Sequence, residues 1–182
     1  GALDCKKSTY ITFSYNHFWD SGKCNLLGLS EDTTDGLYIT YHHNWYDHSD
    51  SRHPRVRFYS AHVYNNYYDG NSKYGIGSTL GSSVFAESNY FRNCKYPMLT
   101  SMQGSDVADG AEGTFSSEDG GTIKAYGNYM EGQKRFVSYQ EDSVEFDAYV
   151  ASSRNEKLSS SVTSKQGSNT CLLYTSPSPR DA

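Results

Sequence analysis

A short pattern ending in asparagine recurs five times along the chain and limits the folds open to it. It alternates apolar with other residues, reaches Asn and continues with aromatic side chains, as in ITFSYNHF (11–18) and ITYHHNWY (39–46). It returns as AHVYNNYY (61–68), VFAESNYF (84–91) and IKAYGNYM (123–130), where methionine replaces the last aromatic residue. The asparagines are Asn16, Asn44, Asn66, Asn89 and Asn128, at steps of 28, 22, 23 and 39 residues.

The alternation before each asparagine predicts one short strand per unit with one face turned inward. A single strand of this kind cannot bury its face alone, whereas stacking successive units builds a continuous core. The pattern therefore predicts an all-β fold, a single-stranded parallel β-helix. The alternative is an antiparallel sandwich or barrel, in which turn signals recur at about 8–12 residues; the recurrence here is nearer two dozen.

The repeat also predicts what each position does. An asparagine at a fixed place in every coil can stack its amide on that of the next coil and satisfy backbone groups of the turn. The aromatic pair that follows is expected to begin the next face of the coil. Small residues are expected to point into a narrow interior, namely Ala61, Ala86, Ala125 and Gly127.

Unequal steps predict insertions, because coils do not stretch easily and extra residues must leave as loops. The step of 28 places one insertion near 20–36, and the step of 39 places a longer one near 98–121. The segment 104–121 is rich in glycine, serine and acidic residues. Such a segment is either a solvated loop or, as often in solenoids, one that shapes a functional rim; its acidic residues would repel a polyanion.

Composition excludes several classes of protein. The chain has 182 residues and a formal net charge of −5, whereas nucleic-acid-binding domains normally carry a basic excess. No run of about 18 apolar residues predicts a membrane span, and residues 1–20 show no signal-peptide pattern. Four scattered cysteines, Cys5, Cys24, Cys94 and Cys171, favour neither a disulfide scaffold nor a zinc site and leave the pairing of one disulfide open.

The pattern ends after residue 140. We therefore expect a partial β-helix domain over 1–150 and a polar, Ser-rich segment over 151–170 that packs outside the helix or caps it. Residues 171–182, CLLYTSPSPRDA, differ in character from the rest and are expected to be a non-native tail, so no function is assigned to Cys171.

Three arginines around one proline stand out in this acidic chain, in SRHPRVRF (51–58). Residues two apart share a face of a strand, so Arg55 and Arg57 are expected to project together. The planar guanidinium suits carboxylates and phosphates, which points to an anionic ligand. The alternative is a set of salt bridges within the protein, to Asp47, Asp50 or Asp69.

The run Arg52-His-Pro54-Arg-Val-Arg57 matches RxPxxR, and with the AHVYNNYYDG that follows it resembles the pectate lyases of polysaccharide lyase family 1. The resemblance spans residues 1–150 and implies a right-handed parallel β-helix. It implies that Arg52 is the general base, that Arg57 binds a substrate carboxylate, and that Lys23 in DSGKCNLLGL (20–29) binds substrate. It also implies a Ca²⁺ ligand at Asp4, the second acid of a DGxxD segment whose first acid would precede Gly1.

These correspondences imply an enzyme that cleaves de-esterified galacturonan (pectin) by calcium-assisted β-elimination. The chain is expected to be the C-terminal part of such a lyase, truncated at its N-terminal end and, alone, weakly active or inactive. We expect a monomer that works outside the cytoplasm, secreted or periplasmic, because a cell does not import intact pectin. Neither nucleic acid nor membrane is expected as a partner.

Three alternatives remain open. A polygalacturonase-like hydrolase would need grouped aspartates, for which Asp32, Asp35, Asp47 and Asp50 are available. A non-catalytic β-helical polysaccharide-binding module would explain the tyrosine-rich faces but not the arginines with Lys23. The third is a histidine metal site, but alternation along the strand sends His42 and His43 to opposite faces. His43 is expected to point inward, before Asn44. The other histidines of 42–62 are expected at the surface or in the groove, with His53 bordering the substrate.

Overall fold

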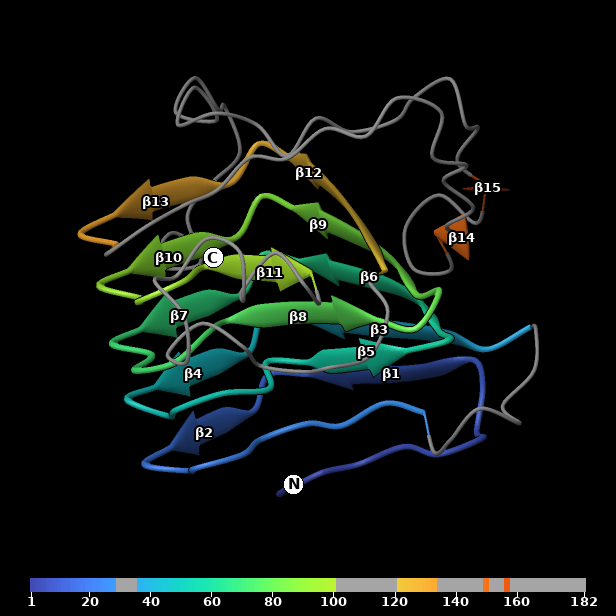
Figure 1. Ribbon diagram of the computed structural model, residues 1–182, viewed down its shortest axis with the longest axis horizontal. Coiled ribbons are helices and arrows are strands. Elements are labelled where there is room, and N and C mark those ends of the chain that lie inside the picture. The colour runs from blue at the N-terminus through green and yellow to red at the C-terminus, as the bar shows by residue number, and fades with distance from the viewer. Residues whose placement is uncertain (29–35, 101–120, 134–148, 151–155, 158–182) are drawn as a thin grey trace.

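The structure is a computed structural model that describes residues 1–28, 36–100, 121–133, 149–150 and 156–157. Every strand of the stacked sheets pairs in parallel with the strand one coil away, which makes a parallel β-helix (Figure 1). Because successive units lie one above the next, residues about two dozen positions apart become neighbours. Within the described ranges, no helix is long and apolar enough to cross a membrane.

Three parallel sheets form the walls. The β1 sheet has the order β1-β3-β6-β9-β12, the β2 sheet β13-β10-β7-β4-β2, and the β5 sheet β11-β8-β5. The strands of the β1 sheet are β1 (Ile11–Ser14), β3 (Tyr38–His42), β6 (Ser60–Tyr64), β9 (Ser83–Glu87) and β12 (Thr122–Tyr126). Those of the β2 sheet are β2 (His17–Trp19), β4 (Trp45–Asp47), β7 (Tyr67–Asp69), β10 (Tyr90–Arg92) and β13 (Tyr129–Glu131). Those of the β5 sheet are β5 (Arg55–Arg57), β8 (Ile76–Thr79) and β11 (Met98–Thr100).

The asparagines form the predicted ladder at the turn between the first two walls. The amide of Asn66 donates to Oδ1 of Asn89 at 3.0 Å, and its own Oδ1 accepts from Asn44 at 2.9 Å. The same contact joins Asn16 to Asn44 and Asn89 to Asn128. The aromatic pair after each asparagine begins the β2 sheet, as predicted.

The core follows the strand register. Ile39, Ala61, Val84 and Ile123 succeed one another inside the β1 sheet, and Tyr46, Tyr68 and Phe91 stack inside the β2 sheet. Ala61 and Ala86 are buried as predicted, and Ala125 packs against the core at its edge. The expectation for Gly127 was wrong: it lies in the turn with φ of +64°, not in a strand facing inward.

Several expectations fall on residues outside the described ranges. They concern residues 101–120 of the insertion near 98–121, residues 29–35 of the insertion near 20–36, residues 134–148 of the expected domain, and the segments 151–155 and 158–182. Two short strands, β14 (Tyr149–Val150) and β15 (Glu156–Lys157), pair in antiparallel fashion, and β14 lies beside β6 (Figure 1).

Candidate active site

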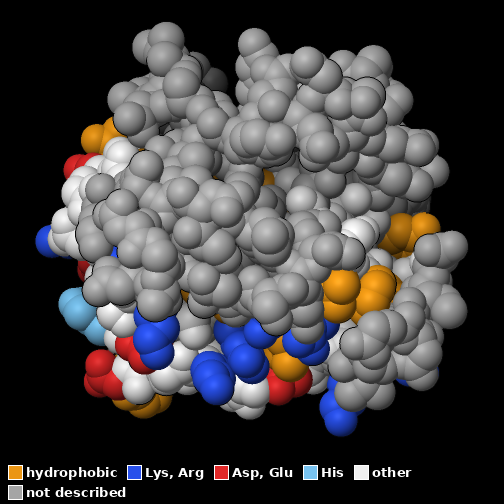
Figure 2. Space-filling view, in the orientation of Figure 1, with side chains coloured by type: hydrophobic (Ala, Val, Ile, Leu, Met, Phe, Trp, Pro, Cys, Tyr) orange, Lys and Arg blue, Asp and Glu red, His pale blue; other side chains and the backbone are white. Residues whose placement is uncertain are grey.

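Three segments far apart in sequence lie on successive rungs at one edge of the β-helix. The Ala2 amide donates to the Lys23 carbonyl at 3.1 Å, and the Asn25 amide donates to the Arg52 carbonyl at 2.8 Å. The Leu26 amide donates to Oδ1 of Asp4 at 2.8 Å. The fold therefore brings the four predicted site residues, Asp4, Lys23, Arg52 and Arg57, onto adjoining rungs. In Figure 2, Lys and Arg side chains gather at the lower edge of the face that this view presents.

Arg52 has an unusual backbone conformation. Its φ is +67°, which costs a non-glycine residue about 1–3 kcal/mol unless the surroundings hold it. The next residue supplies much of that hold, because the His53 amide donates to the Gly75 carbonyl at 3.0 Å and His53 Nδ1 donates to the Tyr74 carbonyl at 2.9 Å. Arg52 itself is only half-buried. The loop is thus fixed from below while the arginine side chain remains accessible.

His53 is completely buried, so the expectation that it borders substrate was wrong. Its carbonyl accepts from the Tyr68 hydroxyl at 2.8 Å, and its ring packs against Tyr46. Burial lowers the pKa of His53 from 6.5 to about 4, although hydrogen bonds with the Tyr74 and Gly75 backbone act in the opposite direction. His53 is therefore a neutral structural anchor of the arginine loop.

Arg55 and Arg57 flank Val56 in β5, and Val56 is fully buried in the core. Arg55 is only 8% exposed, whereas Arg57 is half-buried. The backbone of Arg57 is packed closely by Gly28, where a Cβ atom would lie 2.5 Å from the Arg57 carbonyl oxygen. This close approach fixes where the strand carrying Arg57 runs.

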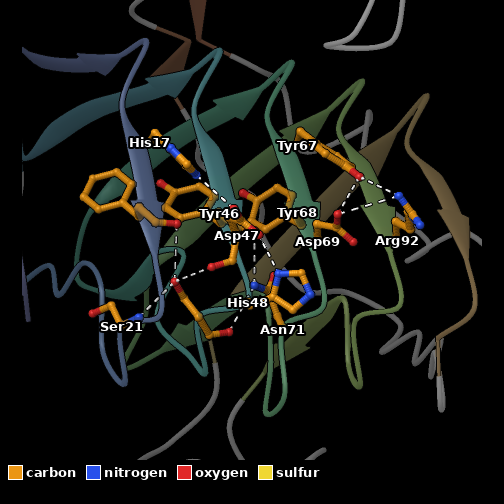
Figure 3. Close-up of polar contacts among 12 residues, drawn as sticks. His17, Ser21, Tyr46, Asp47, His48, Tyr67, Tyr68, Asp69, Asn71 and Arg92 are labelled. Carbon is orange, nitrogen blue, oxygen red and sulfur yellow. Dashed lines mark hydrogen bonds and ion pairs between the residues drawn. The ribbon is translucent and has the colours of Figure 1, made fainter.

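The acidic residues named as alternative partners of the arginines are engaged elsewhere, and Figure 3 shows the contacts of Asp47 and Asp69. Asp47 bonds His17 and His48, and Asp69 bonds the Tyr67 hydroxyl at 2.9 Å and pairs with Arg92. Asp50 bonds Ser72 and Lys73. Within the described part of the chain, no ion pair includes Arg52. The salt-bridge alternative is therefore wrong for Arg52.

These partners also set the charge state of the acids. Burial raises the pKa of Asp47, but hydrogen bonds from His48 and His17 outweigh it, so the pKa lies below its usual value. A hydrogen bond from the Ser72 hydroxyl lowers the pKa of Asp50. Burial acts in the opposite direction, and Lys73 lowers the pKa further. Both carboxyl groups are ionised at neutral pH, which makes neither of them a proton donor of the kind a hydrolase needs.

The expectation for His42 and His43 was wrong. His43 lies in the turn with φ of +54°, and this conformation brings its Nδ1 within 2.8 Å of His42 Nδ1 instead of sending the rings to opposite faces. The rings stack on tyrosines, His43 on Tyr15 and His42 on Tyr64. Desolvation lowers the pKa of both, so both are neutral near pH 7.

A metal ion finds no complete set of ligands in the described residues. They contain no group of three or more His, Cys, Asp or Glu side chains that could hold one. Asp4 is exposed, and it contacts the Gly1 amino group as well as the Leu26 amide. The described residues therefore do not form a calcium site by themselves. The three described cysteines, Cys5, Cys24 and Cys94, are free thiols.

Comparison with known proteins decides the family. A family model described as pectate lyase matches residues 1–170. The chain belongs to the pectate lyase family. It is 40% identical over 101 residues to a pectate trisaccharide-lyase of Bacillus licheniformis, a match covering 55% of this chain and 30% of the relative. It is 37% identical over 106 residues to pectate lyase B of Dickeya chrysanthemi, covering 58% and 28%.

Solved pectate lyases share the fold. Pectate lyase R236F from Xanthomonas campestris superposes with a TM-score of 0.61 at 29% identity, covering 78% of this chain and 39% of that one. A pectate lyase of Bacillus sp. N165, in complex with trigalacturonate, gives 0.58 at 28% identity, covering 71% and 41%. The chain thus spans about 30% of the curated relatives' length and about 40% of these two structures.

One residue beside this candidate site was missed in the sequence. Tyr74 is buried beside the arginine loop, where its amide donates to the Asp50 carbonyl at 3.2 Å and its carbonyl accepts from His53 Nδ1 at 2.9 Å. A signal was present: Tyr74 follows Arg52 by 22 residues, the same step that separates Asn44 from Asn66. A residue one step further along the repeat is a neighbour on the next coil.

Proposed function

We propose that this chain carries the proton-abstracting and substrate-binding side of a pectate lyase, which cleaves de-esterified α-1,4-galacturonan by β-elimination. The observation that carries the proposal is an accessible arginine, Arg52, that has no acidic partner within the described residues and lies one rung from Lys23. The family membership of the chain and a relative in complex with trigalacturonate support the choice of substrate.

Each sugar of this polymer carries a carboxylate at C6, and the C5 proton lies alpha to it. In the proposed reaction Arg52, in its neutral form, takes the C5 proton. The electron pair of the C5–H bond becomes the C4–C5 double bond, and the glycosidic oxygen at C4 leaves with the electrons of its bond. Arg57 and Lys23 bind uronate carboxylates and stabilise the charge that develops as the proton departs.

The surroundings favour this role for Arg52. A carboxylate partner would stabilise the charged guanidinium, and Asp47 and Asp50 are both held by other residues. An arginine acts as a base only in its neutral form, so activity is expected to rise toward alkaline pH.

Pectate lyases as a family are generally calcium-dependent. Calcium bound between protein and substrate would supply positive charge at the uronate carboxylate. We propose Asp4 as the residue of this chain that contributes a carboxylate oxygen, since its side chain is exposed on the rung next to Lys23. Calcium takes about six to eight oxygen ligands, so the remainder come from outside the described residues. Because its polymer substrate lies outside cells, we propose that the protein works there.

Ultraviolet absorbance of the unsaturated product on polygalacturonate tests the proposal directly. Arg52→Ala should lower kcat by about 100- to 10,000-fold, the range for loss of a general base. Arg92→Ala is the matched control: it removes an exposed arginine of the β2 sheet that pairs with Asp69, and it should leave turnover unchanged.

Other outcomes identify the alternatives. Reducing ends that appear without absorbance would show hydrolysis. Polygalacturonate binding that Arg52→Ala leaves intact, with neither signal present, would show a binding module. Full turnover in Arg52→Ala would refute the assignment of the base.

A further inference from the structure

The outer face of the β2 sheet carries a pocket that the proposed reaction does not use. Its volume is about 320 Å³, within the range of about 300 to 1,000 Å³ that is usual for small-ligand pockets. Residues of β2, of β4 and of the turns after these strands line it, namely His17, Trp19, Asp20, Asp47 and His48. None of the residues assigned above to catalysis or substrate binding is among them, so the pocket is distinct from the candidate active site.

Both tryptophans of the chain lie exposed on this face. Trp19 is 62% exposed and Trp45 is 40% exposed. The ring of His17 stacks on Trp45 with 4.1 Å between centroids and lies tilted against Trp19 at 5.1 Å. The face of an aromatic ring is electron-rich and attracts C–H groups. These rings therefore offer an apolar surface to the C–H face of a sugar ring.

Asp47 determines which ring nitrogens the two histidines present to the pocket. Its carboxylate, ionised at neutral pH, accepts from His17 Nε2 at 3.0 Å and from His48 Nδ1 (Figure 3). In the neutral rings, Nδ1 of His17 and Nε2 of His48 are therefore unprotonated acceptors. Asp20 adds an exposed carboxylate to which no group in the described ranges donates. The histidines and Asp20 thus supply acceptors, which suit the hydroxyl groups of a sugar.

The charge of the pocket selects among sugars. Asp20 and Asp47 place two carboxylates there, and neither lysine nor arginine lines it. A uronate carboxylate would be repelled, in contrast to the edge that carries Lys23 and Arg52. Asp47 already accepts from two rings, so a cationic ligand would find only the Asp20 carboxylate unpaired. A neutral sugar fits both the aromatic surface and the acceptors.

We propose that this pocket binds a neutral saccharide, whose ring packs on Trp19 and whose hydroxyl groups donate to His17, His48 and Asp20. This binding goes beyond the proposed reaction and does not depend on it. Asp20 precedes Lys23 by three residues, and His48 precedes Arg52 by four, so at most about 14 Å of chain separates the pocket from the active site. A neutral saccharide held here would keep the protein close to charged stretches of the same polymer or of a neighbouring one.

Tryptophan fluorescence tests the proposal at the site itself, because the chain has no tryptophan besides Trp19 and Trp45. Two neutral probes should each give a saturable change. These are β-1,4-galactohexaose, which represents a separate neutral polysaccharide, and methyl-esterified hexagalacturonate, which represents neutral units of pectin. The tighter of the two identifies the source of the ligand. Charged hexagalacturonate should bind at this site at least tenfold more weakly than either.

Variants separate this site from its surroundings and from the active site. Trp19→Ala should weaken binding of the neutral probes about tenfold in isothermal titration calorimetry, as for loss of an aromatic anchor, and Trp19→Phe should retain most of the affinity. Tyr126→Ala is the matched control, since it removes a side chain that is 63% exposed from the β1 sheet, and it should bind like the native sequence. Arg52→Ala should also bind normally, so a failure of the proposed function would leave this result unchanged.

Three results would overturn the proposal. One is the absence of a saturable change with both neutral probes. Another is equal affinity in Trp19→Ala and the native sequence. The third is tighter binding of a glucosamine hexamer that is lost at high salt, because it would show a site for cations.

Discussion

Replacing Asn66 with alanine should destabilise the protein far more than an average substitution. The Asn66 side chain is fully buried; it donates to the Tyr41 carbonyl at 3.0 Å and to Asn89 Oδ1 at 3.0 Å. It accepts from the backbone and the side-chain amide of Asn44, both at 2.9 Å. Alanine removes these bonds and leaves the buried backbone amide of Asn44 without the acceptor it has here. At about 1 kcal/mol for each of four bonds, the free energy of unfolding should fall by about 4 kcal/mol.

Asn16 provides the matched control at the end of the same ladder. It is only half-buried; its amide donates to Ser14 and Asn44, and in the described part of the chain no group donates to its Oδ1. Asn16→Ala should therefore cost about 1 kcal/mol. Urea unfolding followed by circular dichroism gives both values from the midpoint and slope. Losses that agree within about 0.5 kcal/mol would refute the reasoning, because the ladder would then contribute no more inside the stack than at its end.

Three further predictions concern the site. The native state disfavours charged His53, whose pKa is about 4 against 6.5 in the unfolded chain. The free energy of unfolding should therefore fall by on the order of 3 kcal/mol as the pH drops from about 6.5 to 4. Denaturant titrations at each pH should show this fall, and His53→Gln should show a flatter dependence on pH. Gly28→Ala should lower the melting temperature and raise KM for polygalacturonate, because Gly28 has φ of +83° and a Cβ atom there would meet the Arg57 backbone. Lys23→Ala should raise KM about tenfold through a lost contact with a carboxylate, and it should also lower kcat because its charge stabilises the departing proton's electron pair, in steady-state assays.

The overall architecture could be predicted because each coil repeats the same local rule. Alternation of apolar residues fixes which side chains of a strand face inward, so Ile39, Val63 and Val84 were assignable from the pattern alone. The asparagines were recognisable because only a short amide can bond the turn backbone and the next amide together. The regular step of the repeat then implied stacking of the coils.

The turns before the asparagines could not be predicted from propensity. The residue there has φ between +51° and +64° in every described coil, at Tyr15, His43, Asn65, Ser88 and Gly127. Left-handed backbone is normally a position for glycine or asparagine, and only two of these five residues fit. The ladder bonds impose the conformation in the other coils. Alternation therefore failed at His43, one residue after the strand had ended.

The site was only partly visible for a related reason. A motif read along the chain finds residues close in sequence, such as Arg52 and Arg57, whereas the partners of Arg52 come from other coils. Burial of His53 was hidden because the polar segment 51–58 gives no sign that one side of it faces the core. Tyr74 lacked any motif of its own, and only its step of 22 residues from Arg52 marked it as a neighbour.

The stacking of coils makes the site more rigid than a loop of this composition would be alone. Lys23, Arg52 and Tyr74 lie on three successive coils, and strands in a sheet are spaced by about 4.8 Å. Backbone bonds such as that from Asn25 to the Arg52 carbonyl, at 2.8 Å, hold each coil to the next. The left-handed conformation of Arg52 is therefore maintained from both sides. A backbone held in this way carries the arginine at a fixed place on the site, which lowers the entropy cost of bringing its side chain to the reacting atoms.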